Sequence, residues 1–132
     1  MDKFFYEETE FKIDKKAIFI IKDKEQNQID KITANICSLN QTTMKINFEN
    51  NNFLFTLFNL IDNKDLFLLC KLSLEEREFV FCATPILINL IDINRKEILV
   101  DAKLRFSNKP TTRNNIIDLL TLILMKEIDF TS

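Results

Sequence analysis

Few residues of this 132-residue chain could carry catalytic chemistry. The adjacent carboxylates Glu75 and Glu76 could act as an acid–base pair, but they lie in SLEERE, which we interpret as a solvated connection between strands. The sequence contains no histidine and no glycine. These absences exclude a Ser-His-Asp triad, a histidine metal site, a phosphate-binding glycine loop and a GxGxxG fingerprint. We therefore predict a protein that is not an enzyme and has no catalytic residues.

Three cysteines, Cys37, Cys70 and Cys82, are the other candidates for site chemistry. Their odd number and long spacings match neither a disulfide framework nor a metal-binding motif. All three fall in apolar, strand-like patterns, where a free cysteine acts as a small hydrophobic residue. They predict core positions, no metal site and a reducing compartment.

The charges indicate neither a nucleic-acid partner nor a membrane segment. The formal net charge is −2, and the basic residues are scattered among acids, so the sequence lacks the basic excess of a phosphate-binding surface. The N-terminal MDKFFYEETEF is acidic where a signal peptide is basic. No stretch approaches the roughly 20 apolar residues that span a bilayer. We predict a cytoplasmic protein with no transmembrane segment.

Most of the chain alternates apolar and polar residues with the period of a half-buried strand. In TMKINF, for example, three apolar residues share one face. Short polar turns rich in Asn and Asp separate these segments. We predict a mainly β fold, a small antiparallel barrel of six or seven strands, with Pro85 bending or ending the hydrogen-bonded part of the sixth segment. The predicted strands are residues 17–21, 29–37, 43–48, 53–58, 65–74, 79–91 and 98–106.

After SNKPTT the apolar period becomes that of an α-helix, which we predict at about residues 112–128. Thr111 or Thr112 can cap this helix, with Pro110 just outside it. A helix that is apolar over most of its circumference cannot bury all of it against one barrel wall. It therefore either lies in a groove of its own chain or presents its outer side to another molecule. The apolar positions are Ile116, Ile117, Leu119, Leu120, Leu122, Ile123, Leu124, Met125 and Ile128.

This order of segments resembles the PilZ family, small β-barrel receptors for cyclic di-GMP. The family signature is RxxxR near the start, [D/N]xSxxG at a strand corner, and a closing strand whose aromatic precedes a helix that starts near an arginine. Residues 104–120 (LRFSNKPTTRNNIIDLL) are similar to the closing segment, with Phe106 and Arg113 at its key positions. The resemblance implies one PilZ-like barrel domain over residues 1–132, with a C-terminal helix.

At the corner, NICSLN (35–40) departs from the family pattern. Asn35 matches the permitted Asn, but Cys37 stands where the pattern has Ser and Asn40 where it has Gly. Asn visits left-handed backbone readily, so we expect Asn40 to keep the turn while filling the space next to the main chain. The neighbouring Ser38 is out of phase, and we expect it on the opposite face of the strand.

The RxxxR signature is also changed. No arginine precedes Arg77, and only Lys12 and Lys16 stand at the required spacing. Arginine binds phosphates and guanine edges through a planar, bidentate group, whereas lysine offers a point charge. Each bidentate contact that is lost lowers the binding free energy by about 1–3 kcal/mol. If a nucleotide is bound at all, the resemblance implies that the ligand-binding residues are Lys12, Lys16, Asn35, Cys37 and Asn40.

We therefore favour a non-enzymatic PilZ-like adaptor that does not bind cyclic di-GMP tightly and has no other cofactor. It would act through protein contacts in a motility, secretion or surface-signalling pathway, the usual settings of the family. The partner is another protein or a second copy of the chain. The expected contact residues are Phe4, Phe5, Tyr6, Ile117, Leu124 and Met125.

Two alternatives stay open. The first is a genuine cyclic di-GMP receptor that uses Lys12, Lys16 and Asn35, with Arg95 or Arg113 reaching in. The second is a small chaperone of a flagellar or secretion apparatus, because TPILINLIDINRKEILV is similar to a segment of flagellar assembly factors.

Overall fold

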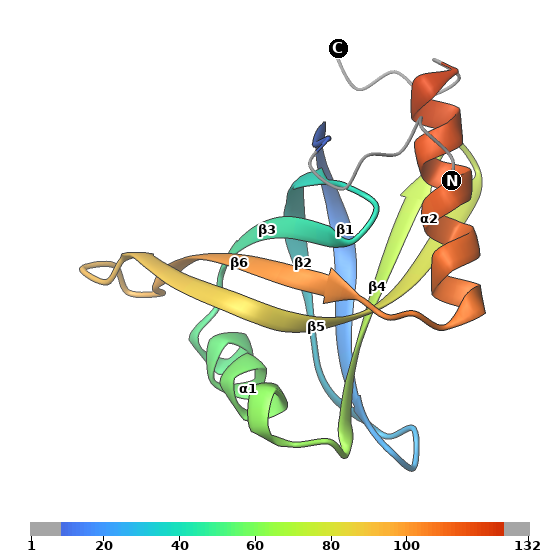
Figure 1. Cartoon of the computed structure of the whole chain (residues 1–132). Coiled ribbons are helices and arrows are strands. Elements are labelled where there is room, and N and C mark those ends of the chain that lie inside the picture. Colours follow the sequence, from blue (N-terminus) through green and yellow to red (C-terminus); the bar gives the residue numbers. More distant parts are fainter. Residues whose placement is uncertain (1–8, 126–132) are drawn as a thin grey trace.

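The computed structural model describes residues 9–125, in which six antiparallel strands close into a barrel accompanied by two helices (Figure 1). Around the ring the strands follow the order β1-β2-β3-β6-β5-β4. This mainly β architecture with its C-terminal helix is the one that the PilZ resemblance implies. The elements are β1 (Phe11–Asp23), β2 (Gln28–Leu39), β3 (Thr43–Glu49), α1 (Asn51–Asp62), β4 (Leu66–Leu74), β5 (Arg77–Asp92), β6 (Leu99–Phe106) and α2 (Pro110–Leu124).

The barrel closes around apolar side chains that point inward from alternate positions of each strand. In β3, Met44, Ile46 and Phe48 are buried while Lys45 is exposed, which confirms the predicted alternation. The same pattern holds in β4 and β6. Each fully buried large side chain of this kind contributes roughly 1.5–3 kcal/mol. The largest fully buried side chains of the barrel and of α1 together are Phe19, Phe53, Phe81, Ile13, Ile21, Ile36, Leu39, Met44, Ile46, Leu54, Leu57 and Leu68.

The segment predicted as a strand at residues 53–58 is instead helix α1, so that prediction is wrong. The run FLFTLFNLI is apolar at both strand and helix spacings, and a capping residue shortly before it, Asn50, favours the helix. Asn50 is an N-cap whose side-chain oxygen accepts a hydrogen bond from the Phe53 amide at 2.9 Å. The helix packs against β5, β2 and β4. Its buried residues, spaced as in a helix, are Phe53, Leu54, Leu57 and Leu60.

Strand β5 changes neighbours near its midpoint. It pairs with β4 from Arg77 to Ala83 and with β6 from Ala83 to Asp92. An irregularity in register between Pro85 and Leu87 follows the change, which agrees with the predicted bend, although the strand does not end there. The second half of β5 and β6 form a hairpin whose connecting loop projects to one side of the barrel (Figure 1).

Helix α2 starts slightly earlier than predicted and uses its threonine differently. Pro110 is its first residue, which suits proline because the missing N–H has no helical partner there. Thr112 is not a cap: it is buried, and its hydroxyl accepts a hydrogen bond from the Cys82 amide at 2.9 Å. Asn115 Oδ1 accepts from the Val80 amide at 3.0 Å. The helix therefore covers an edge of β5, and its predicted C-terminal end lies outside the described residues.

Glu75 and Glu76 form the two-residue turn between β4 and β5. Their φ angles are 47° and 69°, so both occupy the left-handed region, as in the type I′ hairpin turns that favour Asn-Gly. Both side chains are exposed. This placement agrees with the predicted solvated connection between strands.

The helical assignment of residues 51–62 predicts that substitutions at two phenylalanines change the stability by very different amounts. Phe53→Ala should lower the free energy of unfolding by about 3–5 kcal/mol, because Phe53 has no exposed surface and packs edge-on against Phe48 at 5.1 Å. Phe55→Ala should change it by less than about 0.5 kcal/mol, because Phe55 is 60% exposed. Urea denaturation measures both. A strand would place these two side chains on the same face, so equal losses would contradict the helix.

The turn predicts a stabilising double substitution. Glu75→Asn with Glu76→Gly should raise the free energy of unfolding by roughly 1–2 kcal/mol, because these residues adopt left-handed backbone at lower cost. The control Glu75→Ala with Glu76→Ala removes the same charges but retains the Cβ atoms. Thermal unfolding should show a gain for the first variant only. An equal gain in both would assign the effect to charge and not to backbone strain.

Candidate functional site

Three lysines lie in one row across the outer face of the barrel. Lys12 of β1 pairs with Ser38 of β2, which pairs with Lys45 of β3. Lys45 in turn pairs with Lys103 of β6, and Lys103 pairs with Leu87 of β5. Directly paired residues of antiparallel strands project to the same face, and Lys45 is exposed, so the whole row faces outward.

A second row, mainly of amides, runs beside the lysines. Lys16 of β1 pairs with Asn35 of β2, which pairs with Asn47 of β3. Asn47 pairs with Asp101 of β6, which pairs with Asn89 of β5. The predicted ligand residues Lys12, Lys16 and Asn35 thus lie on one outer face, and we call this surface of two rows the outer polar face.

A hollow of about 400 Å³ lies on the outer polar face. Its lining combines two lysines, one carboxylate, one amide and a thiol with a few apolar groups. Such a surface can hold a polar, partly anionic ligand, but the carboxylate opposes an anion. The lining residues are Cys37, Lys45, Ile46, Leu87, Asn89, Asp101, Ala102 and Lys103.

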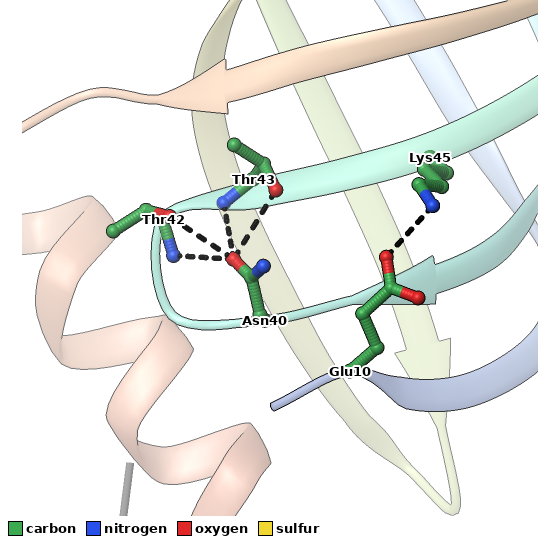
Figure 2. A network of polar contacts seen from close by, with 5 residues as sticks. All are labelled: Glu10, Asn40, Thr42, Thr43 and Lys45. Carbon is green, nitrogen blue, oxygen red and sulfur yellow. Dashed lines mark hydrogen bonds and ion pairs between the residues drawn. The ribbon is translucent and has the colours of Figure 1, made fainter. Parts of the chain in front are cut away.

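Carboxylates of the N-terminal part of the chain already bind two groups of this face. Glu10 forms an ion pair with Lys45 at 2.8 Å (Figure 2). This hydrogen bond and the charge of Glu10 raise the pKa of Lys45. Asp14, which has a left-handed φ of 55° in an irregular part of the β1–β2 ladder, accepts a hydrogen bond from Asn35 at 3.0 Å. The positive charge available to a ligand is reduced accordingly.

Cys37 and Ser38 both lie on the outer side of β2, which corrects the expected placement of Ser38 and the prediction that Cys37 is a core residue. The β2–β3 ladder shifts register between Ile36 and Ser38, so Cys37 is an extra residue and the phase changes after it. Burial is the main cause that raises the pKa of the Cys37 thiol. The thiol is therefore neutral at physiological pH and is a poor nucleophile.

Asn40 holds the corner through its side chain. Its Oδ1 accepts hydrogen bonds from the amides of Thr42 and Thr43 at 2.9 and 2.7 Å and from their hydroxyls at 3.1 and 3.2 Å (Figure 2). Asn40 is buried and is not among the described residues with positive φ. The expectation that Asn40 replaces glycine by adopting left-handed backbone is therefore wrong. Hydrogen bonds to its amide oxygen stabilise the corner, where the family pattern has a glycine.

The two arginines considered as ligand contacts have other roles. Arg113 Nη1 donates to the Gln41 carbonyl at 2.6 Å and so ties α2 to the corner. Arg113 also borders a second hollow, of about 240 Å³, together with Arg105. Arg95 pairs with Glu49 at 2.7 Å, next to the tip of the β5–β6 hairpin. Arg95 therefore belongs to the hairpin and not to the outer polar face.

The predicted contact residues of α2 are accessible. Ile117, Leu124 and Met125 are all exposed, whereas Ile116, Leu119 and Leu120 are buried against the barrel. Phe4, Phe5 and Tyr6 lie outside the described residues. Ile117, Leu124 and Met125 are thus available to a partner, and their role remains a proposal.

Sequence reasoning missed Lys45, Lys103 and Asp101 as members of the outer polar face. Their polar positions within TMKINF and ILVDAKLRF were visible, but those two segments are far apart in the sequence. Only the β3–β6 pairing brings Lys45 next to Lys103. No local sequence pattern predicts that these two lysines are neighbours.

Neither a protein-family model nor a curated protein sequence matches the chain. Among solved structures, MrkH of K. pneumonia in its apo state is similar with a TM-score of 0.59 at 12% identity, over 90% of this chain and 51% of that one. A second structure of MrkH, described as a c-di-GMP-dependent transcription regulatory factor, has a TM-score of 0.56 at 9% identity, over 89% of this chain and 50% of that one. The chain therefore spans about half the length of these structures, and the likeness shows the fold.

PlzA of Borreliella burgdorferi in complex with c-di-GMP has a TM-score of 0.48 at 15% identity, over 87% of this chain and 48% of that one. Within residues 9–125, neither helix is long and apolar enough to cross a membrane. Over the same residues, no cluster of three cysteine or carboxylate side chains could hold a metal ion.

The hydrogen bonds of the corner predict how substitutions of Asn40 change the stability. Asn40→Gly restores the residue of the family pattern but removes the oxygen that accepts four hydrogen bonds, so it should lower the free energy of unfolding by about 2 kcal/mol. Asn40→Asp keeps an acceptor oxygen and should lose less. Urea denaturation compares the two. If the glycine variant is as stable as the wild type, the side-chain bonds do not hold the corner.

Proposed function

We propose that this chain is a non-enzymatic PilZ-like adaptor in a cyclic di-GMP-linked regulatory pathway, which does not bind the dinucleotide tightly and acts through protein contacts. The proposal rests mainly on one observation. The chain's own carboxylates Glu10 and Asp14 already bind polar groups of the outer polar face, where the family's ligand would lie. A dinucleotide with two phosphates would have to approach or displace both of them, as well as Asp101.

The residue types on the face support the same proposal. Lys12 and Lys16 are exposed, and neither can offer the fixed pair of parallel N–H groups of a guanidinium. An exposed ammonium also retains its hydration, so its net gain from a phosphate contact is small. Weak, salt-sensitive attraction is the most that these lysines would provide.

A protein partner is supported by the apolar side chains that the fold leaves exposed. Ile117, Leu124 and Met125 on α2 are examples, and large exposed apolar patches are typical of interaction sites. MrkH is described as a c-di-GMP-dependent transcription regulatory factor, which supports placing this chain in a regulatory pathway of that kind. We place its work in motility, secretion or surface signalling, as the PilZ resemblance suggests.

One observation favours a second candidate, a non-standard cyclic di-GMP receptor. Lys12, Lys45 and Lys103 share one row beside a hollow of about 400 Å³, which is an arrangement that attracts an anion. We rank this candidate lower because Glu10 neutralises the middle lysine of the row.

Calorimetric titration with cyclic di-GMP separates the two candidates. The adaptor predicts a dissociation constant weaker than about 100 μM, because the bidentate contacts are missing. The variant with Lys12→Ala and Lys16→Ala should behave like the wild type. A matched control, Lys24→Ala, changes an exposed lysine in the β1–β2 turn. Micromolar binding that is lost in the double variant and retained in the control would establish the receptor instead.

A further inference from the structure

A hollow of about 240 Å³ lies where the end of β6, the corner and the start of α2 meet. It shares no lining residue with the larger hollow on the outer polar face. Among the described residues that line it, two are arginines and none is a carboxylate. We call it the arginine hollow. Its lining residues are Thr42, Thr43, Arg105, Phe106, Asn108 and Arg113.

Different elements hold the two guanidinium groups of the arginine hollow. Arg105 is an exposed residue of β6 that pairs with Thr43 of β3 and Thr84 of β5. Arg113 lies near the start of α2, where its Nη1 donates to the Gln41 carbonyl at 2.6 Å. That bond fixes the direction of the guanidinium and uses one of its five N–H donors. Since no other hydrogen bond within residues 9–125 involves either side chain, the remaining donors are available to a ligand.

The positive charge of the arginine hollow is not offset by an ion pair within residues 9–125, because the three pairs found there involve other cations. The start of α2 adds to the positive potential. Its first turn contains no acidic residue, and its N-cap, Lys109, makes no capping bond with its side chain. The outer polar face differs, because Glu10 and Asp101 oppose an anion there.

We propose that the arginine hollow binds a small phosphate monoester in its doubly charged form. Each guanidinium presents a planar fork of N–H groups that matches a pair of phosphate oxygens, so two forks can contact all three terminal oxygens. The two positive charges also match the dianion, whereas a carboxylate would be satisfied by one of them. The inference goes beyond the proposed function and does not depend on it.

The size and position of the arginine hollow limit the ligand further. A volume of about 240 Å³ is below the usual range of pockets for drug-sized ligands, so a phosphate carrying a small group fits best. Such an anion would bridge Arg105 of β6 and Arg113 of α2 and would offset the repulsion between their like charges. Binding should therefore also raise the melting temperature of the protein.

Calorimetric titration with glycerol 3-phosphate at low ionic strength tests the site. We expect a dissociation constant of about 0.1–1 mM at pH 7.5. The affinity should fall several-fold at pH 5.5, because a phosphate monoester gains its second proton near pH ~6 while arginine stays charged. Dimethyl phosphate, a diester with a single charge, should bind at least about tenfold more weakly.

Substitutions locate the binding at the two arginines. Arg105→Gln removes an exposed guanidinium and should weaken binding by at least about tenfold. Arg113→Lys keeps the charge but loses the planar fork, so it should weaken binding as well. The matched control is Arg77→Gln, which removes the same charge from an exposed arginine at the start of β5, outside the arginine hollow. It should change the affinity by less than about twofold.

The proposal fails if the wild type does not bind glycerol 3-phosphate at about 10 mM, or if Arg77→Gln weakens binding as much as Arg105→Gln. Should Arg105→Gln not fold, NMR shifts of the wild type decide, because they must be largest at Asn108 and Arg113. Shifts centred on Lys45 and Lys103 would place the anion on the outer polar face and overturn the inference. Absence of binding here leaves the adaptor proposal intact, whereas tight binding of cyclic di-GMP overturns only the adaptor.

Discussion

Closure of the six-stranded ring depends on one constraint, that apolar side chains of every strand meet inside it. Phe19, Ile36, Met44, Phe81 and Leu104 come from five different strands and are all almost completely buried. This constraint fixes the inner half of each alternating pattern and leaves the outer half free to vary. Closure of the barrel alone is therefore enough to produce an outer polar face, whether or not that face binds a ligand. A barrel of this kind can keep its fold after its outer residues no longer grip a ligand.

Local contacts within the chain take the places that ligand contacts would need. Glu10 pairs with Lys45, Asp14 accepts from Asn35, and the corner closes on the side-chain oxygen of Asn40. These bonds stabilise the N-terminal strand and the corner without glycine. They also set the electrostatics of the face, because Glu10 offsets the charge of Lys45 and Asp14 adds a negative charge beside Asn35. The same interactions thus explain both the stability of the corner and the weak nucleotide binding that we propose.

The sequence predicts those features that depend on short-range pattern. The alternation in TMKINF and ILVDAKLRF identifies β3 and β6 and their buried faces. FLFTLF misleads because its apolar spacing suits a strand and a helix, and the deciding signal is the single cap Asn50. The position of Ser38 could not be predicted because one extra residue, Cys37, changes the phase of the strand. The lysine row depends on pairing between distant strands, which no local pattern contains.

The central claim concerns the outer polar face. An NMR titration of the isotope-labelled protein with cyclic di-GMP tests it residue by residue. We expect at most small, non-saturating shifts, removed by added salt, at the amides around Lys12, Ser38 and Lys45. Large, saturable shifts concentrated on these amides would contradict the account.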